Sequence, residues 1–317
     1  MAERKFQWKD MWELTKETYK NWNEDEPFRL SAIVAYYAIF SLPALMIIII
    51  SVAGIIFGEK AVQGEVSAQI GGMIGKDAAS SVETMIANSH AEGNTIIATI
   101  IGIATLLFGA TGVFYHLQIS LNHIWNVKPA PDQGIKKLLM DRATSLGVVI
   151  AIGFLLLISL LLTSALSAFS VWISGNLPDF MVYLFFIIEF VISFGVITVL
   201  FAMIFKILPD VQIKWRTVWV GAGITALLFV IGKFALGIYF GKANPGSAFG
   251  AAGSVILILL WVSYSCLILF FGAEFTQVYA KKYGHEIMPS SHAIRTGANH
   301  PLDPKDKTEN RKVQSYK

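Results

Sequence analysis

The first long uncharged stretch of the sequence limits what this chain can fold into. Residues 30–57, LSAIVAYYAIFSLPALMIIIISVAGIIF, run for 28 residues without a charged side chain, between Arg29 and Glu59. A helix of that length reaches about 40 Å, more than the roughly 30 Å of hydrocarbon in a bilayer. A core helix of a water-soluble protein would carry a polar face, whereas polar atoms here are limited to scattered Ser and Tyr residues. The stretch is therefore predicted to span a membrane.

The composition extends this conclusion to the whole chain. Of its 317 residues, 55% are hydrophobic and 15% are charged, and its mean hydropathy is +0.58. These values indicate a polytopic membrane protein, and the apolar runs along the chain predict an all-α fold with six transmembrane helices. The predicted spans are residues 30–57, 95–124, 143–173, 180–205, 217–240 and 247–279. They form one transmembrane domain over residues 30–280.

Three polar segments flank or interrupt these spans. Residues 1–29 form a cytoplasmic arm in which aromatic residues recur at helical spacing from Trp8 to Trp22. This pattern predicts an amphipathic helix that lies either on the membrane surface or against the helical bundle. Residues 58–94 are predicted to form short helices in the first external loop, either as a cap on the bundle or as a lid over a substrate path. Residues 281–317 are polar and contain several prolines, and they are predicted to be a disordered cytoplasmic tail.

The positive charges divide unevenly between the two sides of the predicted bundle. The amino-terminal arm, the even-numbered loops and the tail carry 21 of the 25 Lys and Arg residues, whereas the odd-numbered loops carry three. Cytoplasmic loops of membrane proteins are enriched in Lys and Arg. Both termini are therefore predicted to be cytoplasmic. The remaining cation, Lys233, lies inside the fifth predicted span.

Glu189 and Lys233 are set deepest in apolar sequence. Glu189 is nine residues from the start of its span and Lys233 is seven from the end of the next, which places them roughly 14 and 11 Å below the same membrane surface. Because an isolated charge near mid-membrane costs on the order of 3 kcal/mol, we expect a direct or water-bridged contact between them. The pair would either fix helix register or open as a gate. Lys233 also belongs to a row of mostly small residues, spaced by four from Gly221 to Gly241, that predicts packing against another helix.

Three further polar residues lie toward the predicted cytoplasmic ends of the second and sixth spans. His116, Asn122 and Glu274 all fall within about 12 Å of that interface, so they are predicted to line a water-filled inner mouth. Alternatively, His116 is a buried histidine with satisfied hydrogen bonds, and Glu274 contacts lipid headgroups. The candidate transport or gating residues are thus Glu189, Lys233, His116, Asn122 and Glu274. The sequence predicts no catalytic residue, no metal ligand and no cofactor.

Four stretches of the chain resemble the YihY/BrkB family, whose members were long labelled ribonuclease BN. They are RLSAIVAYYAIFSLPAL in the first span, FGATGVFYHLQISLNHIWNV in the second, LPDVQIKWRTVWVGAGITALLFVIGKFALGIYF before and within the fifth, and ILLWVSYSCLILFFGAEFTQVYA in the sixth. Together they cover roughly residues 25–283, and their specificity lies in their order and spacing. The resemblance implies a protein of the bacterial cytoplasmic membrane with six helices, and it implies no settled biochemical activity.

The residues argue against several enzyme classes. Metal-assisted RNA hydrolysis needs clustered His, Asp or Glu ligands and a basic surface for phosphate groups, and the sequence has no such cluster. It also lacks the GxxxxGK[ST] motif of nucleotide-binding proteins and the HExxH motif of metalloproteases. The chain is therefore predicted not to be an enzyme and not to bind nucleic acid.

Two interpretations of function remain open. The leading one is a transporter or exporter of an unidentified small-molecule or lipid-like substrate, because ionisable groups inside membrane spans are functional candidates by default. The alternative is a non-transporting membrane scaffold or envelope-maintenance factor, whose buried charges only lock the fold. The predicted partners are the lipid bilayer and the transported substrate, and a homo-oligomer is left open.

Overall fold

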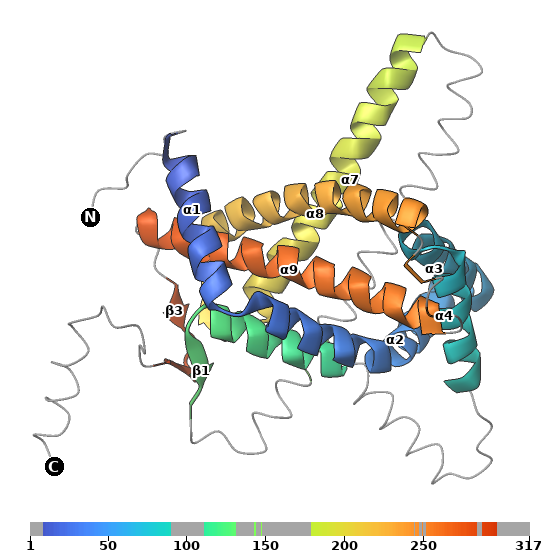
Figure 1. Cartoon of the computed structure of the whole chain (residues 1–317), viewed down its shortest axis with the longest axis horizontal. Coiled ribbons are helices and arrows are strands. Elements are labelled where there is room, and N and C mark those ends of the chain that lie inside the picture. Colours follow the sequence, from blue (N-terminus) through green and yellow to red (C-terminus); the bar gives the residue numbers. More distant parts are fainter. Residues whose placement is uncertain are drawn as a thin grey trace, which may run out of the picture.

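The computed structural model describes residues 9–89, 111–130, 143, 147, 179–243, 245–246, 249, 252–283 and 287–296. Long helices make up most of this part of the chain, and short strands join at one end of it (Figure 1). The helices are α1 (Lys9–Glu24), α2 (Pro27–Phe57), α3 (Glu59–Ile74), α4 (Lys76–Ser89), α7 (Asp179–Ile207), α8 (Trp215–Ala243) and α9 (Gly253–Lys282). A further helical segment covers residues 111–124. The strands are β1 (Val127–Pro129), β2 (Val211–Gln212), β3 (Met288–Pro289) and β4 (Ala293–Arg295).

Helices of membrane-spanning length form the bundle. Residues Ile187–Ile207 of α7, all of α8 and all of α9 are each long and apolar enough to cross a membrane. α2 is equally long, with 31 residues, and covers the first predicted span. The expectation of an all-α membrane protein is therefore confirmed, with α2, α7, α8 and α9 at the first, fourth, fifth and sixth predicted spans.

The second and third predicted spans are described only in small part, so the structure does not test them as it tests the other four. The second is described only over residues 111–124, and the third, residues 143–173, lies outside the described residues apart from Ala143 and Gly147. The count of six spans therefore stays a prediction. The sixth span begins at Gly253 as a helix, six residues later than the predicted start at Ser247. A Cβ atom on Gly253 would lie 3.1 Å from the Cα atom of Gly246, so these small residues make a close turn before the helix.

Helices α8 and α9 are antiparallel and lie in close contact, because a glycine of each faces a threonine of the other. A Cβ atom added to Gly221 would lie 2.9 Å from the Cβ atom of Thr276, and one added to Gly272 would lie 2.8 Å from the Cβ atom of Thr225. Only glycine leaves room for so close an approach. The hydroxyl groups of Thr225 and Thr276 donate hydrogen bonds of 2.7 Å to the carbonyl oxygens of Gly221 and Gly272 in their own helices. Both buried hydroxyl groups are thereby satisfied without a partner across the contact.

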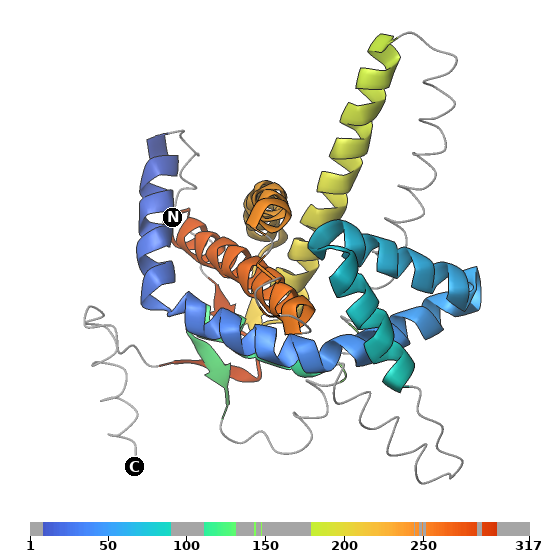
Figure 2. The same ribbon diagram turned by 45° about the vertical axis from the view of Figure 1, so that its right-hand side comes forward.

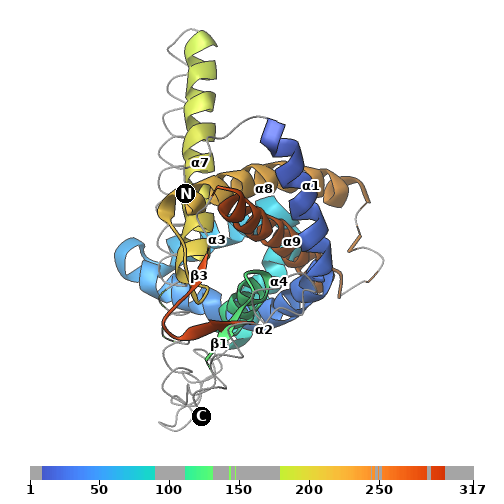
Figure 3. The same cartoon turned by 90° about the vertical axis from the view of Figure 1, so that its left-hand side faces the viewer.

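Helix α9 lies at the centre of the described part of the chain. It contacts α1, α2, α4 and α8, as Figures 2 and 3 show from two directions. The hydroxyl groups of Ser31 of α2 and Ser263 of α9 share a hydrogen bond of 3.1 Å, and Ser81 of α4 donates one of 2.7 Å to Ser254 of α9. Short polar side chains therefore join the central helix to its neighbours where the backbones come close.

The strands connect the carboxyl-terminal segment to two earlier connections. β1 follows the helical segment 111–124 and pairs with β4, while β2 lies between α7 and α8 and pairs with β3. Both pairs are antiparallel, and they lie at the end of the molecule that carries α1 (Figure 1). Residues 287–296 are thus held by backbone hydrogen bonds, so the prediction of a disordered tail is wrong for this part. Strands of two or three residues carry no sequence period that would have revealed them.

Helices α3 and α4 cover the opposite end of the bundle (Figure 1). They confirm the expectation of short helices after the first span. Val62 of α3 and Ala78 and Val82 of α4 pack in one apolar cluster with Ile50 of α2. Gly75 follows the last residue of α3, and its φ angle of 105° is open to glycine and strained for other residues.

Helix α1 packs against the last turns of α9 rather than standing apart from the bundle. Leu14 is fully buried in an apolar cluster with α9, and the ring of Trp22 lies 6.0 Å from that of Phe271, edge-on. Trp12 and Tyr19 are exposed on the other side of the helix. The arm therefore adopts the second of its two predicted arrangements, and its aromatic residues divide between two faces.

The α8–α9 contact predicts that two glycines of one helix differ in their tolerance of alanine. Gly221→Ala would press a methyl group against Thr276, and overpacking of this kind costs typically about 1–3 kcal/mol. Gly223→Ala is the matched control, because nothing lies within 4 Å of its added Cβ atom and alanine favours a helix over glycine. We expect Gly221→Ala to lower the melting temperature of the purified protein and Gly223→Ala to leave it unchanged or raise it. Equal melting temperatures for the two variants would contradict the contact.

Candidate functional site

Glu189 and Lys233 lie on the two apolar helices α7 and α8. Glu189 is half-buried, and the next residues, Phe190 and Val191, are exposed. Lys233 is exposed and is followed by the exposed Phe234. Each charged group therefore interrupts a surface that is otherwise apolar.

The ion pairs of the described residues all lie elsewhere, so none joins Glu189 to Lys233. α7 crosses α8, and the first half of α7, which carries Glu189, diverges from α8 (Figure 1). Residues at equal depth meet only when their helices run side by side. The predicted direct contact is therefore absent, and a water-bridged contact stays a prediction.

Lys233 does not lie on the face of α8 that contacts α9. Gly221 and Thr225 of its row touch α9, whereas a Cβ atom on Gly237 or Gly241 would meet no atom within 4 Å. At 3.6 residues per turn, each step of four residues turns about 40° beyond a full circle. Three such steps carry Lys233 about 120° around the helix from Gly221. The prediction that Lys233 faces another helix fails among the described residues for this reason.

His116 is stacked on an aromatic residue of α2. Its ring centroid lies 3.6 Å from that of Tyr37 with 18° between the ring planes, and Tyr115 meets it edge-on at 5.5 Å. One turn earlier, a Cβ atom on Gly112 would lie 3.3 Å from the hydroxyl oxygen of Ser41. The small residue lets the two helices approach, and the stacking fixes the imidazole between them.

Asn122 is buried and binds the connection between α7 and α8. Its side-chain nitrogen donates a hydrogen bond of 2.9 Å to the carboxylate of Asp210, and its side-chain oxygen accepts one of 2.8 Å from the backbone N–H of Asp210. The side-chain nitrogen of Gln118, one turn earlier, lies 3.5 Å from the same carboxylate oxygen. These bonds hold the helical segment 111–124 against the start of β2, which gives Asn122 a structural role.

Glu274 is almost completely enclosed between α9 and α1, with 1% of its surface exposed. Neither carboxylate oxygen has a hydrogen-bond partner of regular geometry in the described part of the chain. The side chain of Asn21 on α1 interacts with the carboxylate. The residue therefore faces α1 and not a lipid headgroup region.

The three residues predicted to line one inner mouth thus meet three parts of the chain. His116 contacts α2, Asn122 binds the α7–α8 connection, and Glu274 faces α1. Sequence reasoning missed the partners Asp210 and Asn21, because a single acid or amide in a polar segment carries no periodic signal. Among the described residues, no three His, Cys, Asp or Glu side chains gather as metal ligands.

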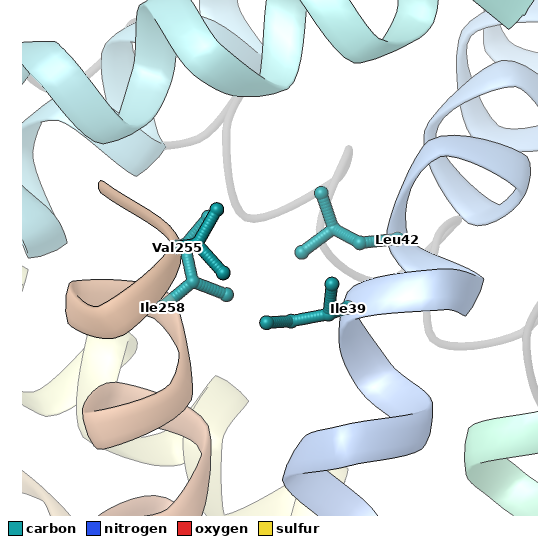
Figure 4. A pocket seen from close by; sticks show the side chains of 4 residues that line it. All are labelled: Ile39, Leu42, Val255 and Ile258. Carbon is teal, nitrogen blue, oxygen red and sulfur yellow. The ribbon is translucent and has the colours of Figure 1, made fainter. Parts of the chain in front are cut away.

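A narrow apolar pocket lies between α2 and α9 (Figure 4). Its lining side chains, Ile39, Leu42, Val255 and Ile258, are all aliphatic. It leaves no room for a water molecule, so it is a gap in helix packing and offers no polar group to a ligand.

The bonds of Asn122 predict a loss of stability on truncation. Asn122→Ala removes both hydrogen bonds to Asp210, and the loss of buried polar partners costs about 1–3 kcal/mol. Asn23→Ala is the control, since Asn23 is an exposed asparagine of α1. We expect a lower melting temperature for Asn122→Ala alone. An equal change for both variants would contradict the structural role of Asn122.

Comparison with known proteins places the chain in a family of membrane proteins. A family model described as Virulence factor BrkB matches residues 18–295. A UPF0761 membrane protein of Verminephrobacter eiseniae is 29% identical over 177 residues, which are 55% of this chain and 40% of the relative. A second from Tolumonas auensis is 28% identical over 187 residues, 56% of each chain. A third from Kangiella koreensis is 23% identical over 288 residues, 89% of this chain and 68% of the relative.

The chain thus spans about half the length of the first two of these relatives. No solved structure matches it. The family model covers most of the chain, as the resemblance of the four sequence stretches led us to expect. The chain therefore belongs to the virulence factor BrkB family.

Proposed function

We propose that this protein is a transporter or exporter in the bacterial cytoplasmic membrane, acting on an unidentified anionic or lipid-like solute. The proposal rests on the position of Glu189 and Lys233 and on the lack of an ion pair between them among the described residues. Both lie on helices of membrane-spanning length, and no ion pair joins them in the described part of the chain. A charge inside a membrane is costly unless it is paired or hydrated.

A static scaffold would neutralise such charges permanently. Its simplest solution is a fixed ion pair, and the divergence of α7 from α8 does not provide one for Glu189 and Lys233 (Figure 1). A water-filled path along the two helices would hydrate both groups instead. This contrast favours a transporter over a scaffold or an envelope-maintenance factor. The proposal assigns no enzymatic activity to the chain.

The arrangement of the two ends of the molecule supports a cytoplasmic location for both termini. α1 and all described strands lie at one end, and α3 and α4 lie at the other (Figure 1). The first end carries Lys206, Lys214, Lys281 and Lys282, in agreement with the tendency of cations to face the cytoplasm. The proposed topology has six spans, with the α3–α4 end outside the cell.

Transport is tested by flux into proteoliposomes. We expect vesicles with the protein to dissipate an imposed pH gradient, or to accumulate inorganic phosphate as an anionic probe, faster than empty vesicles. Glu189→Gln and Lys233→Met should each lower that flux by about tenfold, equal to about 1.4 kcal/mol in the barrier. Lys214→Met is the matched control, because Lys214 is an exposed cation just before α8. Flux equal to that of empty vesicles under both gradients would favour the scaffold.

The topology is tested by labelling single cysteines in a Cys266→Ser background. A membrane-impermeant maleimide added to intact cells whose outer membrane has been made permeable should label Gln69→Cys, which lies in α3. It should label Gln133→Cys, in the loop after the second predicted span, only after the inner membrane is opened. The reverse pattern would overturn the proposed orientation.

A further inference from the structure

The contact between α1 and α9 is anchored at both of its ends. At one end the hydroxyl group of Tyr283 donates a hydrogen bond of 2.9 Å to Asp10, and Lys282 lies 3.2 Å from the same carboxylate. At the other end Trp22 packs on Phe271. The two helices therefore run antiparallel, and Glu274 lies in the layer between the two anchors.

This layer contains polar atoms that the helices enclose but do not satisfy. Five buried side-chain nitrogen and oxygen atoms have no hydrogen-bond partner in the described part of the chain, and four of them belong to Thr18, Trp22 and Glu274. Thr18 is fully buried one turn before Trp22, on the face of α1 that packs on α9. The layer thus brings a hydroxyl group, an indole N–H and a carboxyl group together without closing bonds among them.

We propose that Glu274 is a proton-binding site whose protonation controls the docking of α1 on α9. An ionised carboxylate enclosed here loses its hydration, and its interaction with the Asn21 side chain replaces only part of what water supplied. A neutral carboxyl group loses far less and also gains a donor O–H. The docked state therefore holds the proton, and ionisation requires α1 to move away so that water reaches the carboxylate.

The chemistry of the layer favours a proton over a metal cation. The indole N–H of Trp22 is a donor only, and a bound cation would repel it. Glu274 is also the one carboxylate among the unsatisfied buried groups of the described residues. A neutral acid, by contrast, can share bonds with Thr18 and Trp22 directly or through water.

The charged groups around Glu274 act in both directions, and the carboxylates of α1 oppose its ionisation. Asp25 and Glu17 of α1 disfavour its ionised form, whereas the side chain of Asn21 on α1 and Lys281 of α9 favour it. From α8, the partly buried residues that reach this cluster are Val220 and Ile224, which carry no charge. Ionisation of Glu274 thus adds a third carboxylate opposite two on α1, and the repulsion assists undocking.

The sign of the pH dependence follows from this arrangement. A group that binds its proton more tightly in the docked state stabilises that state at low pH, and the stabilisation is lost as the pH rises. The anchor at Tyr283 persists over the same range, because burial and then the hydrogen bond to Asp10 raise the pKa of Tyr283 above its ordinary value of 10. Release of α1 at alkaline pH would therefore report on Glu274.

The test is the accessibility of a thiol on the docked face of α1 in the full-length protein. Thr18→Cys in a Cys266→Ser background places a thiol where the exposed surface is 0%. Lys16→Cys, at an exposed position of the same helix, corrects for the effect of pH on thiol reactivity. Relative to that control, we expect maleimide labelling of Thr18→Cys to rise about tenfold between about pH 6 and about pH 9.

Variants of Glu274 decide between this proposal and general alkaline loosening. Glu274→Gln is neutral at every pH, so maleimide labelling of Thr18→Cys in this variant should stay low from about pH 6 to about pH 9. Glu274→Leu should give the same result, and it replaces Glu274→Gln if that variant does not fold. Glu83→Gln, an exposed carboxyl on α4, should keep the rise seen in the parent protein. A flat profile in the parent, or an unchanged rise in Glu274→Gln and Glu274→Leu, would overturn the proposal. The readout needs no flux, so it is independent of the proposed transport activity.

Discussion

The close approach of α8 and α9 is the contact on which the rest of the described structure depends. In a bilayer the hydrophobic effect does not drive helices together, so they associate through packing and polar contacts. Thr225 lies against Gly272 and Thr276 against Gly221, which brings the two backbones together over about one turn of each helix. Each threonine hydroxyl group donates a hydrogen bond within its own helix, so neither needs a partner on the other helix. The remaining faces of α9 are then available to α1, α2 and α4.

The described polar side chains of this bundle fall into two groups, those that are matched by a polar partner and those that are not. The hydroxyl groups of Ser31 and Ser263 meet each other, and Asn122 is matched by Asp210, so these residues contribute to a fixed framework. Glu189 and Glu274 have no such partner in the described part of the chain. A protein that needed only rigidity would have little use for this contrast, because unsatisfied buried groups lower stability.

Much of the fold could be predicted from the sequence because the signal of a membrane span is local. A run such as residues 30–57 needs no partner to be recognised, and the same holds for α7, α8 and α9. The short helices after the first span could also be predicted, because their pattern of apolar residues is local too. The count of spans was reached by the same reasoning and stays a prediction beyond these helices.

The candidate site was much harder to predict from the sequence, because it depends on how the helices cross. Equal depth suggested a contact between Glu189 and Lys233, and the divergence of α7 from α8 separates them. A row spaced by four residues suggested that Lys233 faces another helix, and the pitch of the helix turns it away from α9. The partner of Asn122, Asp210, lies 88 residues away and carries no pattern of its own. The recurrence of Gly221 and Thr225 did predict close packing, since small residues act over a single turn.

The pairing of the carboxyl-terminal strands has a consequence for the biosynthesis of the protein. Lys128 pairs with Ile294, 166 residues later, and Gln212 pairs with Met288, 76 residues later. A ribosome adds about 5–20 residues per second, so β1 waits on the order of ten seconds for its partner. During that time its edge is open to wrong pairing. The last described residues therefore complete both pairings, and the end of the molecule that carries α1 closes only after all the described helices have been made.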